Sequence, residues 1–412
     1  MNIAHIITKL ELGGAQKQLL SLITHLDKKR YNSSLITAQD GLLIKDALLI
    51  KDLRLKKSRF LQRSINPLKD FLALYEIYRF IKRNKVDIVH THSSKAGILG
   101  RWAARLSRIN PARGRTSNGV KIVVHTVHGW SFNEYQNCLW RKIIIWLEKF
   151  TARITDKLIV VSYHDLQKGL ENHIGYRDKY KLIRYGIDYE EFTSLDKNTR
   201  QDKTNYLTRF SKEEAGLREE LGIDIYDLVV GMVSCFKPQK SPQDFIKLAF
   251  LVNKVIPRAK FLLVGDGVLR KEIERLISKF DLGQRVILTG WRQDVSRVLS
   301  AIDVFILTSL WEGLPISVLE AMAASRPVVV TNTGGVAEII LEGRTGFLVS
   351  PGETKKMADK LNALLKDENL RRQIGQNAKG SLDPNFTLEN MVRNTEDLYQ
   401  VLIKKVGVEN VN

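Results

Sequence analysis

Two glutamates stand eight positions apart in a stretch that also has the residue types of an anion site. Glu312 is followed by a Gly-Leu-Pro turn, and an apolar run leads from that turn to Glu320. On a helix, residues eight apart lie about 80° around the axis and about 12 Å along it. The two carboxylates therefore cannot chelate one small ion together. We expect them to contact different groups of an elongated ligand, the alternative being two surface glutamates on an amphipathic helix.

Two features near the glutamates favour a bound anion. Lys240 comes shortly after the apolar run at residues 227–234, and a lysine at a strand's carboxyl end can bind phosphate. Pro315 falls in the first turn of the helix predicted after Glu312, where unpaired backbone amides attract negative charge. The spacing and the residue types together predict a ligand that contains phosphate.

The first half of the chain holds weaker candidates. Gly13 and Gly14 follow the first apolar strand and precede a helical segment, so their amides could approach a phosphate, although such a pair is more often just a tight turn. His128 comes just past the strand at residues 120–127, where open α/β sheets bind ligands. His125 points to the other face if that strand continues. A structural histidine is the alternative for His128.

Short β-branched runs alternate with helical segments throughout, which predicts an α/β fold with parallel sheets and crossover helices. We expect strands at residues 2–8, 33–38, 86–92, 120–127 and 157–162, and then at residues 227–234, 259–267, 285–290, 304–309, 326–333 and 346–350. The polar stretch from about 188 to 220 has no strand-like run and is the predicted connection between two domains. We place the domains at residues 1–190 and 211–386, and the final helix at 387–405 could cross back onto the first.

One helix of the first half has clear end signals. Asn66 and Pro67 are a predicted N-cap and first helical residue, and the helix ends in basic residues. Its predicted apolar side contains Leu68, Phe71, Leu72, Tyr75, Tyr78 and Phe80.

Charge is distributed unevenly along the 412 residues. Residues 1–200 carry a net charge of +18 and residues 201–412 a net charge of +2, within a total of +20. Residues 51–115 alone hold 17 basic and 4 acidic side chains. A basic half can meet nucleic acid, acidic polysaccharide or an anionic membrane surface, or it can be merely a solvated face.

The compartment is predicted from what the composition lacks. The first residues do not have the basic and apolar regions of a secretory signal, and no apolar run reaches the length of a membrane span. Cys138 and Cys235 are the only cysteines, which fits a reducing compartment and argues against a disulfide framework or a structural zinc. We expect a cytoplasmic protein.

At this point the chain resembles the retaining glycosyltransferases of family four, which have the GT-B fold and assemble bacterial polysaccharides. The resemblance spans nearly the whole length, and its most specific part is TSLWEGLPISVLEAMAASRPVV, residues 308–329. It also rests on LGGAQ, HTHSSKAGILGR, HTVHGW, PQK and ILTGWRQDV. The resemblance implies two Rossmann-like domains with parallel sheets facing across a cleft. The N-terminal domain would be the acceptor side, and the C-terminal domain would bind a nucleotide diphosphate sugar, with a UDP-sugar as the expected donor and no cofactor.

The family's motif assigns roles to residues of this chain. Glu312 would contact hydroxyls of the transferred sugar, Glu320 the ribose, and Lys240 the diphosphate, while His128 would stand beside the donor sugar. Glu312, Lys240 and His128 are the implied catalytic residues. The other implied donor-binding residues are Gly13, Gly14, Arg292, Gly313, Leu314, Pro315, Ile316 and Ser317, and the implied acceptor-side residues are Ser94 and Lys95.

One position departs from the family. Many members have an arginine a few residues before the lysine, whereas this chain has Cys235, so one positive charge is missing or is supplied by Lys237. No Asp-x-Asp pair occurs, and we therefore expect no metal on the phosphates. Lys240 and helix N-termini would stabilise the departing diphosphate instead.

The expected activity is transfer with retention to a glycan or polyprenyl-linked acceptor in cell-surface polysaccharide synthesis. The basic first domain, with Phe60, Phe80 and Trp102 among its charges, would hold the enzyme on the inner face of the cytoplasmic membrane. The alternatives are a GT-B-fold epimerase or phosphorylase, and a basic nucleic-acid-binding protein. The last lacks a recognition helix, a zinc finger or an aromatic RNA-binding signature.

Overall fold

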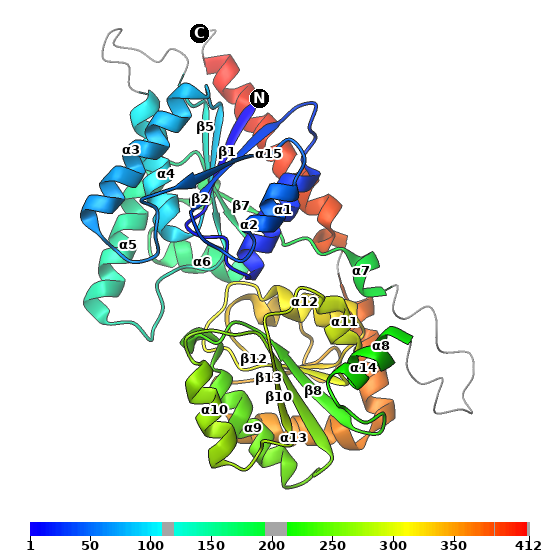
Figure 1. Cartoon of the computed structure of the whole chain (residues 1–412). Coiled ribbons are helices and arrows are strands. Elements are labelled where there is room, and N and C mark those ends of the chain that lie inside the picture. The colour runs from blue at the N-terminus through cyan, green and yellow to red at the C-terminus, as the bar shows by residue number, and fades with distance from the viewer. Residues whose placement is uncertain (109–118, 194–211, 383, 410–412) are drawn as a thin grey trace. The chain divides into compact units, whose positions relative to one another are not determined.

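The chain folds into two compact units in a computed structural model that describes residues 1–108, 119–193, 212–382 and 384–409 (Figure 1). The first unit consists of Met1–Gly186 together with the C-terminal segment from Leu388, and the second consists of Ile187–Thr387. The predicted connection between domains, at about 188–220, lies partly outside the described residues.

The first unit is built on a seven-stranded sheet in which every pairing is parallel. Its strand order is β3-β2-β1-β4-β5-β6-β7, so the order reverses between β1 and β4. Ligands of such sheets bind outside the carboxyl ends of the strands at this switch point. The strands are β1 (Asn2–Ile6), β2 (Asn32–Ala38), β3 (Arg54–Ser58), β4 (Ile88–His92), β5 (Ile122–Val127), β6 (Lys157–Val160) and β7 (Tyr180–Leu182).

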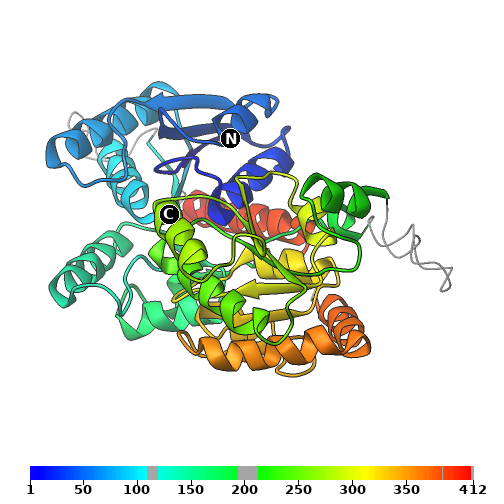
Figure 2. The same ribbon diagram turned by 60° about the horizontal axis from the view of Figure 1, so that its bottom comes forward.

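Helices cover both faces of this sheet. Helices α1 and α2 pack over β1 and β2, and the last helix, α15, returns beside α1 on the same face (Figure 2). Helices α3 and α4 pack on the opposite face. The helices of this unit are α1 (Gly14–His25), α2 (Ile44–Leu49), α3 (Pro67–Arg83), α4 (Ser94–Arg108), α5 (Cys138–Ala152), α6 (Tyr163–Glu171) and α15 (Leu388–Glu409), with a 3-10 turn at Arg177–Lys179.

The end signals of α3 are confirmed, but its predicted apolar side is only partly right, because Tyr78 and Phe80 pack against the core and other residues of that side do not. The side chain of Asn66 accepts a hydrogen bond from the amide of Lys69, and Pro67 is the first helical residue. The residues that α3 buries are Ala73, Ile77 and Ile81. Several larger residues of the predicted side remain exposed, namely Leu68, Phe71 and Tyr75. The buried residues are four positions apart and form a narrow stripe that packs in one core cluster with α4.

The second unit repeats the architecture with a six-stranded parallel sheet of order β10-β9-β8-β11-β12-β13, whose switch point lies between β8 and β11. Its strands are β8 (Leu228–Val233), β9 (Ala259–Val264), β10 (Val286–Gly290), β11 (Val304–Leu307), β12 (Val328–Thr331) and β13 (Phe347–Val349). Its helices are α7 (Tyr189–Thr193), α8 (Lys212–Glu220), α9 (Pro242–Asn253), α10 (Arg270–Lys279), α11 (Val295–Ser300), α12 (Ile316–Ala323), α13 (Thr354–Lys366) and α14 (Glu368–Gly380). Short 3-10 turns occur at Pro238–Lys240, Gly334–Glu338 and Pro384–Phe386.

The parallel α/β architecture predicted from the sequence is confirmed, but strands β3 and β7 were not predicted. Both lie at edges of the first sheet, where a strand needs no continuous apolar run. Both cysteines are free thiols. Within the described ranges, no helix has the length and apolar character needed to cross a bilayer.

Candidate active site

The predicted phosphate lysine and the first predicted glutamate lie together at the switch point of the second sheet. Lys240 ends the 3-10 turn that follows β8, and Glu312 lies in the loop that follows β11, the neighbouring strand. The ammonium group of Lys240 donates to Oε1 of Glu312, and the two side chains are only 17% and 6% exposed. A cation and a carboxylate are thus held at the edge where parallel sheets bind their ligands.

Neighbouring residues fix both partners of this pair. The hydroxyl of Ser309 donates to Oε1 of Glu312 at 2.6 Å. The side-chain amide nitrogen of Gln239 donates to the carbonyl of Trp311 at 2.9 Å. The same nitrogen lies 3.5 Å from Oε2 of Glu312. The hydroxyl of Thr308 donates to the carbonyls of Lys240 and Ser241. The two loops are therefore joined by hydrogen bonds and present the pair as one rigid group.

A glycine turn supports the Glu312 loop from the other side. Gly334 has a φ of +61°, and a Cβ placed on it would lie 2.3 Å from the carbonyl oxygen of Glu312. The amide of Gly335 donates to the carbonyl of Gly313 at 2.6 Å. The loop can take this position because Gly334 carries no side chain.

Helix α12 starts directly after the loop. Pro315 is its N-cap and Ile316 its first residue, and no side chain caps the amides of the first turn. Gly313, Leu314 and Pro315 are buried, whereas Ile316 and Ser317 are partly exposed. Glu320 lies further along α12 and is 8% exposed. The helix thus begins with amide donors beside Glu312, the arrangement that favours an anion.

Two other predicted donor residues of this unit have contacts of their own. Arg292, after β10, donates to Asp294 at 2.6 and 2.9 Å and to Glu220 at 2.7 Å, and these hydrogen bonds raise its pKa above the ordinary value. Its predicted role at the nucleotide base stays a prediction. Cys235 is partly exposed at the end of β8. The next residue, Phe236, donates a hydrogen bond from its backbone amide to the carbonyl of Asp266, in the turn that follows β9.

In the first unit, His128 lies within hydrogen-bonding distance of two other aromatic side chains, those of His92 and Tyr185. Its Nε2 lies 3.0 Å from Nδ1 of His92, and its Nδ1 lies 2.8 Å from the hydroxyl of Tyr185. Although part of His128 reaches the surface, desolvation of the ring lowers its pKa to about 4, so the ring is neutral at pH 7. His92 and Tyr185 fix the orientation of His128.

The ring of His92 lies 4.2 Å, between centroids, from that of His90, which lies under helix α15. Nδ1 of His90 lies 2.6 Å from the hydroxyl of Tyr399, and its Nε2 lies 2.7 Å from the hydroxyl of Thr126. One ring nitrogen from each of His5, His90 and His92 lies within 4.8 Å of the other two, a spacing that would suit a metal ion. His90, however, already has a partner on each nitrogen. Burial lowers the pKa of all three histidines, that of His5 to about 3.

The remaining predicted residues of the first unit lie around its switch point. Gly13 is the N-cap of α1 after β1, and Gly14 is the first residue of that helix. Ser94 begins α4 after β4, and Lys95 forms an ion pair with Asp70 of α3. His125 contacts Thr91 at 2.9 Å, and its ring lies close to Gly97 of α4, on the face opposite His128, as the strand alternation predicted.

Sequence reasoning missed His92, Tyr185, Ser309 and Gln239. The first could have been found, because His90 and His92 share one face of β4, which pairs with β5, the strand that ends just before His128. Tyr185 and Ser309 carried no such signal, because their contacts depend on loops.

Two family patterns match the chain. The pattern described as Glycosyltransferase Family 4 matches residues 12–191, and that described as Glycosyl transferases group 1 matches residues 214–381. Among curated proteins, the chain is 32% identical over 405 residues to UDP-Gal:alpha-D-GlcNAc-diphosphoundecaprenol alpha-1,3-galactosyltransferase of Escherichia coli, covering 97% of this chain and 96% of that protein. It is 33% identical over 315 residues to alpha-D-kanosaminyltransferase of Streptomyces kanamyceticus, covering 74% and 76%.

Solved structures share the fold. The structure of Anabaena HepE in complex with UDP and glucose aligns over 97% of this chain and 100% of that one, with a TM-score of 0.79 at 20% identity. Sucrose-phosphate synthase from Thermosynechococcus elongatus aligns over 98% and 100%, with a TM-score of 0.77 at 20% identity. With two Rossmann-like units and a full-length relative above 30% identity, the chain belongs to the family 4 glycosyltransferases of the GT-B fold.

Proposed function

We propose that this enzyme transfers a hexosyl or N-acetylhexosaminyl group, with retention, from a UDP-sugar to a glycan or lipid-linked acceptor in cell-surface polysaccharide synthesis. The observation that carries the proposal is the Lys240–Glu312 pair at the switch point of the second sheet. The names of the relatives add support, because the Escherichia coli protein uses UDP-Gal and a diphosphoundecaprenol-linked acceptor, and HepE was crystallised with UDP.

The second unit would bind the donor. Lys240 and the amides at the start of α12 would neutralise the charge that accumulates on the departing diphosphate. Glu312 would contact hydroxyls of the transferred sugar, and Glu320 the ribose. The acceptor would attack on the face that the diphosphate leaves, and an oxygen of the diphosphate would take the acceptor's proton.

The first unit would present the acceptor and place His128 beside the donor sugar. A neutral ring suits that position, because it does not repel a sugar that gains positive charge. His92 and Tyr185 are positioning residues in this proposal, since they contact His128 and not the sugar.

The direct test offers the purified chain a panel of nucleotide sugars with a GlcNAc-diphospho-polyprenol acceptor. We expect a product that contains one added sugar, with the anomeric configuration of the donor when it is examined by NMR. Lys240→Ala should lower turnover at least tenfold, whereas Lys247→Ala, a matched change of an exposed lysine on α9, should leave it unchanged. Equal turnover by both variants, or an inverted product, would refute the proposal.

The proposal includes transfer without a divalent metal on the diphosphate. The cationic and amide groups named above would do the work that a metal does in other glycosyltransferases. Activity should therefore persist in EDTA. Complete loss of activity, restored by magnesium or manganese, would contradict this part.

The proposed location is the inner face of the cytoplasmic membrane, held peripherally. The support is the net charge of +18 on the first 200 residues and the lipid-linked acceptor named for the Escherichia coli relative. The aromatic residues first chosen from the sequence do not supply the contact, because Phe60 and Phe80 pack against the core and the indole of Trp102 donates to Thr151.

A further inference from the structure

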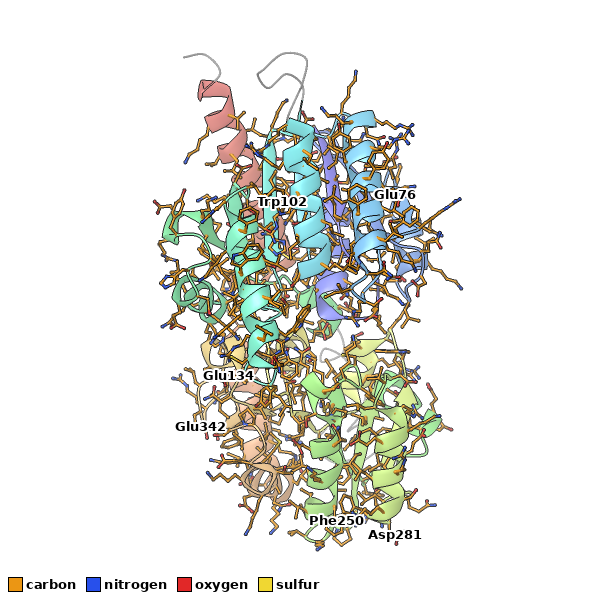
Figure 3. The ribbon with its side chains drawn as sticks, turned by 90° about the vertical axis from the view of Figure 1, so that its left-hand side faces the viewer. Glu76, Trp102, Glu134, Phe250, Asp281 and Glu342 are labelled. Atoms are coloured by element: carbon orange, nitrogen blue, oxygen red, sulfur yellow. The ribbon has the colours of Figure 1, made fainter. Side chains whose placement is uncertain are left out.

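Helix α5 exposes an unusual amount of apolar surface. In Figure 3, α4 with Trp102 lies between α3, which carries Glu76, and α5. The residues that α5 buries, Glu148, Thr151 and Ala152, all lie near its C-terminal end. Five large apolar side chains are exposed, led by Leu139 at 69% and Trp146 at 61%; they are Leu139, Trp140, Ile143, Trp146 and Phe150. Single exposed apolar residues are ordinary, but such a group on one helix indicates a binding surface.

Four of the five exposed residues, all except Trp140, form one stripe with a basic edge. Positions 139, 143, 146 and 150 follow the i, i+4, i+7 and i+11 spacing of a single helix face. Lys142, Lys149 and Arg153 fall along one side of that face. The guanidinium of Arg153 lies 5.8 Å from the ring centroid of Phe150.

Helix α3 repeats this pattern on the same face of the sheet. Leu68 is 70% and Phe71 66% exposed, and Tyr75 follows one turn later. Further along the same side the residues become basic, at Arg79 and Lys82, both exposed. The stripe on α3 thus also passes from apolar to cationic.

The acidic side chains of helices α3, α4 and α5 are Asp70, Glu76 and Glu148. Each is paired, with Lys95, Lys56 and Arg101 respectively. The surface formed by the exposed residues of α3 and α5 therefore offers apolar groups and positive charge. A protein partner could match the apolar part, but apolar and aromatic side chains beside a one-sided basic edge match the interface of an anionic bilayer better.

We propose that this α3/α5 surface is where the enzyme docks on an anionic lipid bilayer. The side chains of Leu139, Ile143 and Trp146 would enter the headgroup region, and Lys142 and Lys149 would contact lipid phosphates. This inference identifies the contact surface for the peripheral location proposed above and rests on that proposal. It does not require the donor or the reaction to be as proposed, because binding to lipid can be measured without either.

The test is sedimentation with phosphatidylglycerol-containing vesicles and with neutral phosphatidylcholine vesicles, without any nucleotide sugar. The wild-type chain should bind the anionic vesicles at low salt and release them at high salt. Leu139→Ser/Trp146→Ser and Lys142→Glu/Lys149→Glu should each lower the bound fraction at least tenfold. Leu48→Ser/Leu49→Ser is the matched control, because it removes two exposed leucines from α2, on the opposite face of the same sheet, and should bind as the wild type does.

Each variant should melt near the wild-type temperature, since the changed side chains are exposed except for that of Lys149, which is half-buried. Unchanged vesicle binding by the α5 variants, equal binding of the wild type to neutral vesicles, or binding to neither kind would overturn the proposal. So would a dimer in solution that Leu139→Ser/Trp146→Ser dissociates, because the apolar stripe would then contact a second copy. Transfer to a detergent-dispersed short-chain acceptor, measured separately, shows whether the proposed reaction holds whatever the vesicle result is.

Discussion

Because Lys240 is paired with Glu312, the diphosphate of the proposed complex would compete with a carboxylate that already holds the lysine. In the proposed complex the lysine would turn to the phosphates, and Glu312 would be released to the sugar hydroxyls. The pair would thus keep both charges compensated while the site is empty. Burying the cation without this partner would cost free energy.

The first prediction separates the two partners by their effect on binding. Glu312→Gln should leave UDP affinity unchanged or raise it, because Lys240 loses its competitor, while transfer falls at least tenfold. Lys240→Ala should weaken UDP binding by about tenfold or more, since a charge-assisted contact to phosphate is lost. Titration calorimetry with UDP measures both affinities. A parallel loss of UDP affinity in the two variants would contradict the competition.

At the scale of elements, loops position the site residues and therefore depend on tight backbone contacts. The turn after β12 supports the Glu312 loop because Gly334 lies against the carbonyl of Glu312. A larger residue at this position would move the carboxylate. This sensitivity to the size of residue 334 arises from the contact between the loops after β11 and β12.

The second prediction concerns this contact. Gly334→Ala should lower transfer at least tenfold, because its Cβ would meet the Glu312 carbonyl at 2.3 Å and the chain must shift. Gly343→Ala is the control, since Gly343 has a similar φ of +73° and open space around it. Backbone strain alone should cost the control about 1 kcal/mol of stability and little activity. Equal activity losses in the two variants would show that strain, and not the loop position, matters.

The third prediction concerns how α5 is held. Nη2 of Arg101 lies 2.7 Å from Oε2 of Glu148, and both side chains are buried. Glu148→Ala should lower the free energy of unfolding by about 3–5 kcal/mol, because a guanidinium is left buried without its carboxylate. Urea denaturation measures this loss. The double variant Arg101→Met/Glu148→Leu should recover most of the lost free energy of unfolding. No recovery would mean that lost packing, and not the unpaired charge, causes the loss in Glu148→Ala.

At the scale of the whole molecule, titratable groups are divided as unevenly as net charge. All eight histidines precede residue 187, so they belong to the first unit. Five of them have pKa values lowered by burial, namely His5, His90, His92, His125 and His128. Protonation of these histidines in the unfolded chain, below about pH 6.5, therefore lowers the stability of the first unit and not that of the second.

The fourth prediction follows from that sign. Between pH 6.5 and about 4, the unfolded first unit binds protons that the folded one does not, so its stability should fall as the pH falls through this window. Each excess proton costs roughly 1 kcal/mol per pH unit. Calorimetry from pH 7.5 to 5 should show one transition moving to lower temperature while the other stays. Parallel shifts of both transitions would contradict the prediction.

The sequence by itself determined the parallel α/β architecture and the position of the motif that contains Glu312 and Glu320. The β-branched runs at β8, β9, β11 and β12 are continuous because these strands are buried on both faces, and such runs are visible without a structure. The edge strands β3 and β7 left no comparable signal. Lys240 and Glu312 could be chosen from their motifs, since each follows a recognisable strand.

Tertiary structure decided which of these residues meet and which side of each helix is buried. The pairing of Lys240 with Glu312, 72 positions apart, depends on β8 and β11 being neighbours, and local sequence does not specify strand order. The contacts of His128 with His92 and Tyr185 likewise join separate loops and strands. Helix α3 buries Ala73, Ile77 and Ile81 and leaves Leu68, Phe71 and Tyr75 exposed, because its packing with α4, and not hydrophobicity alone, decides which side faces the core.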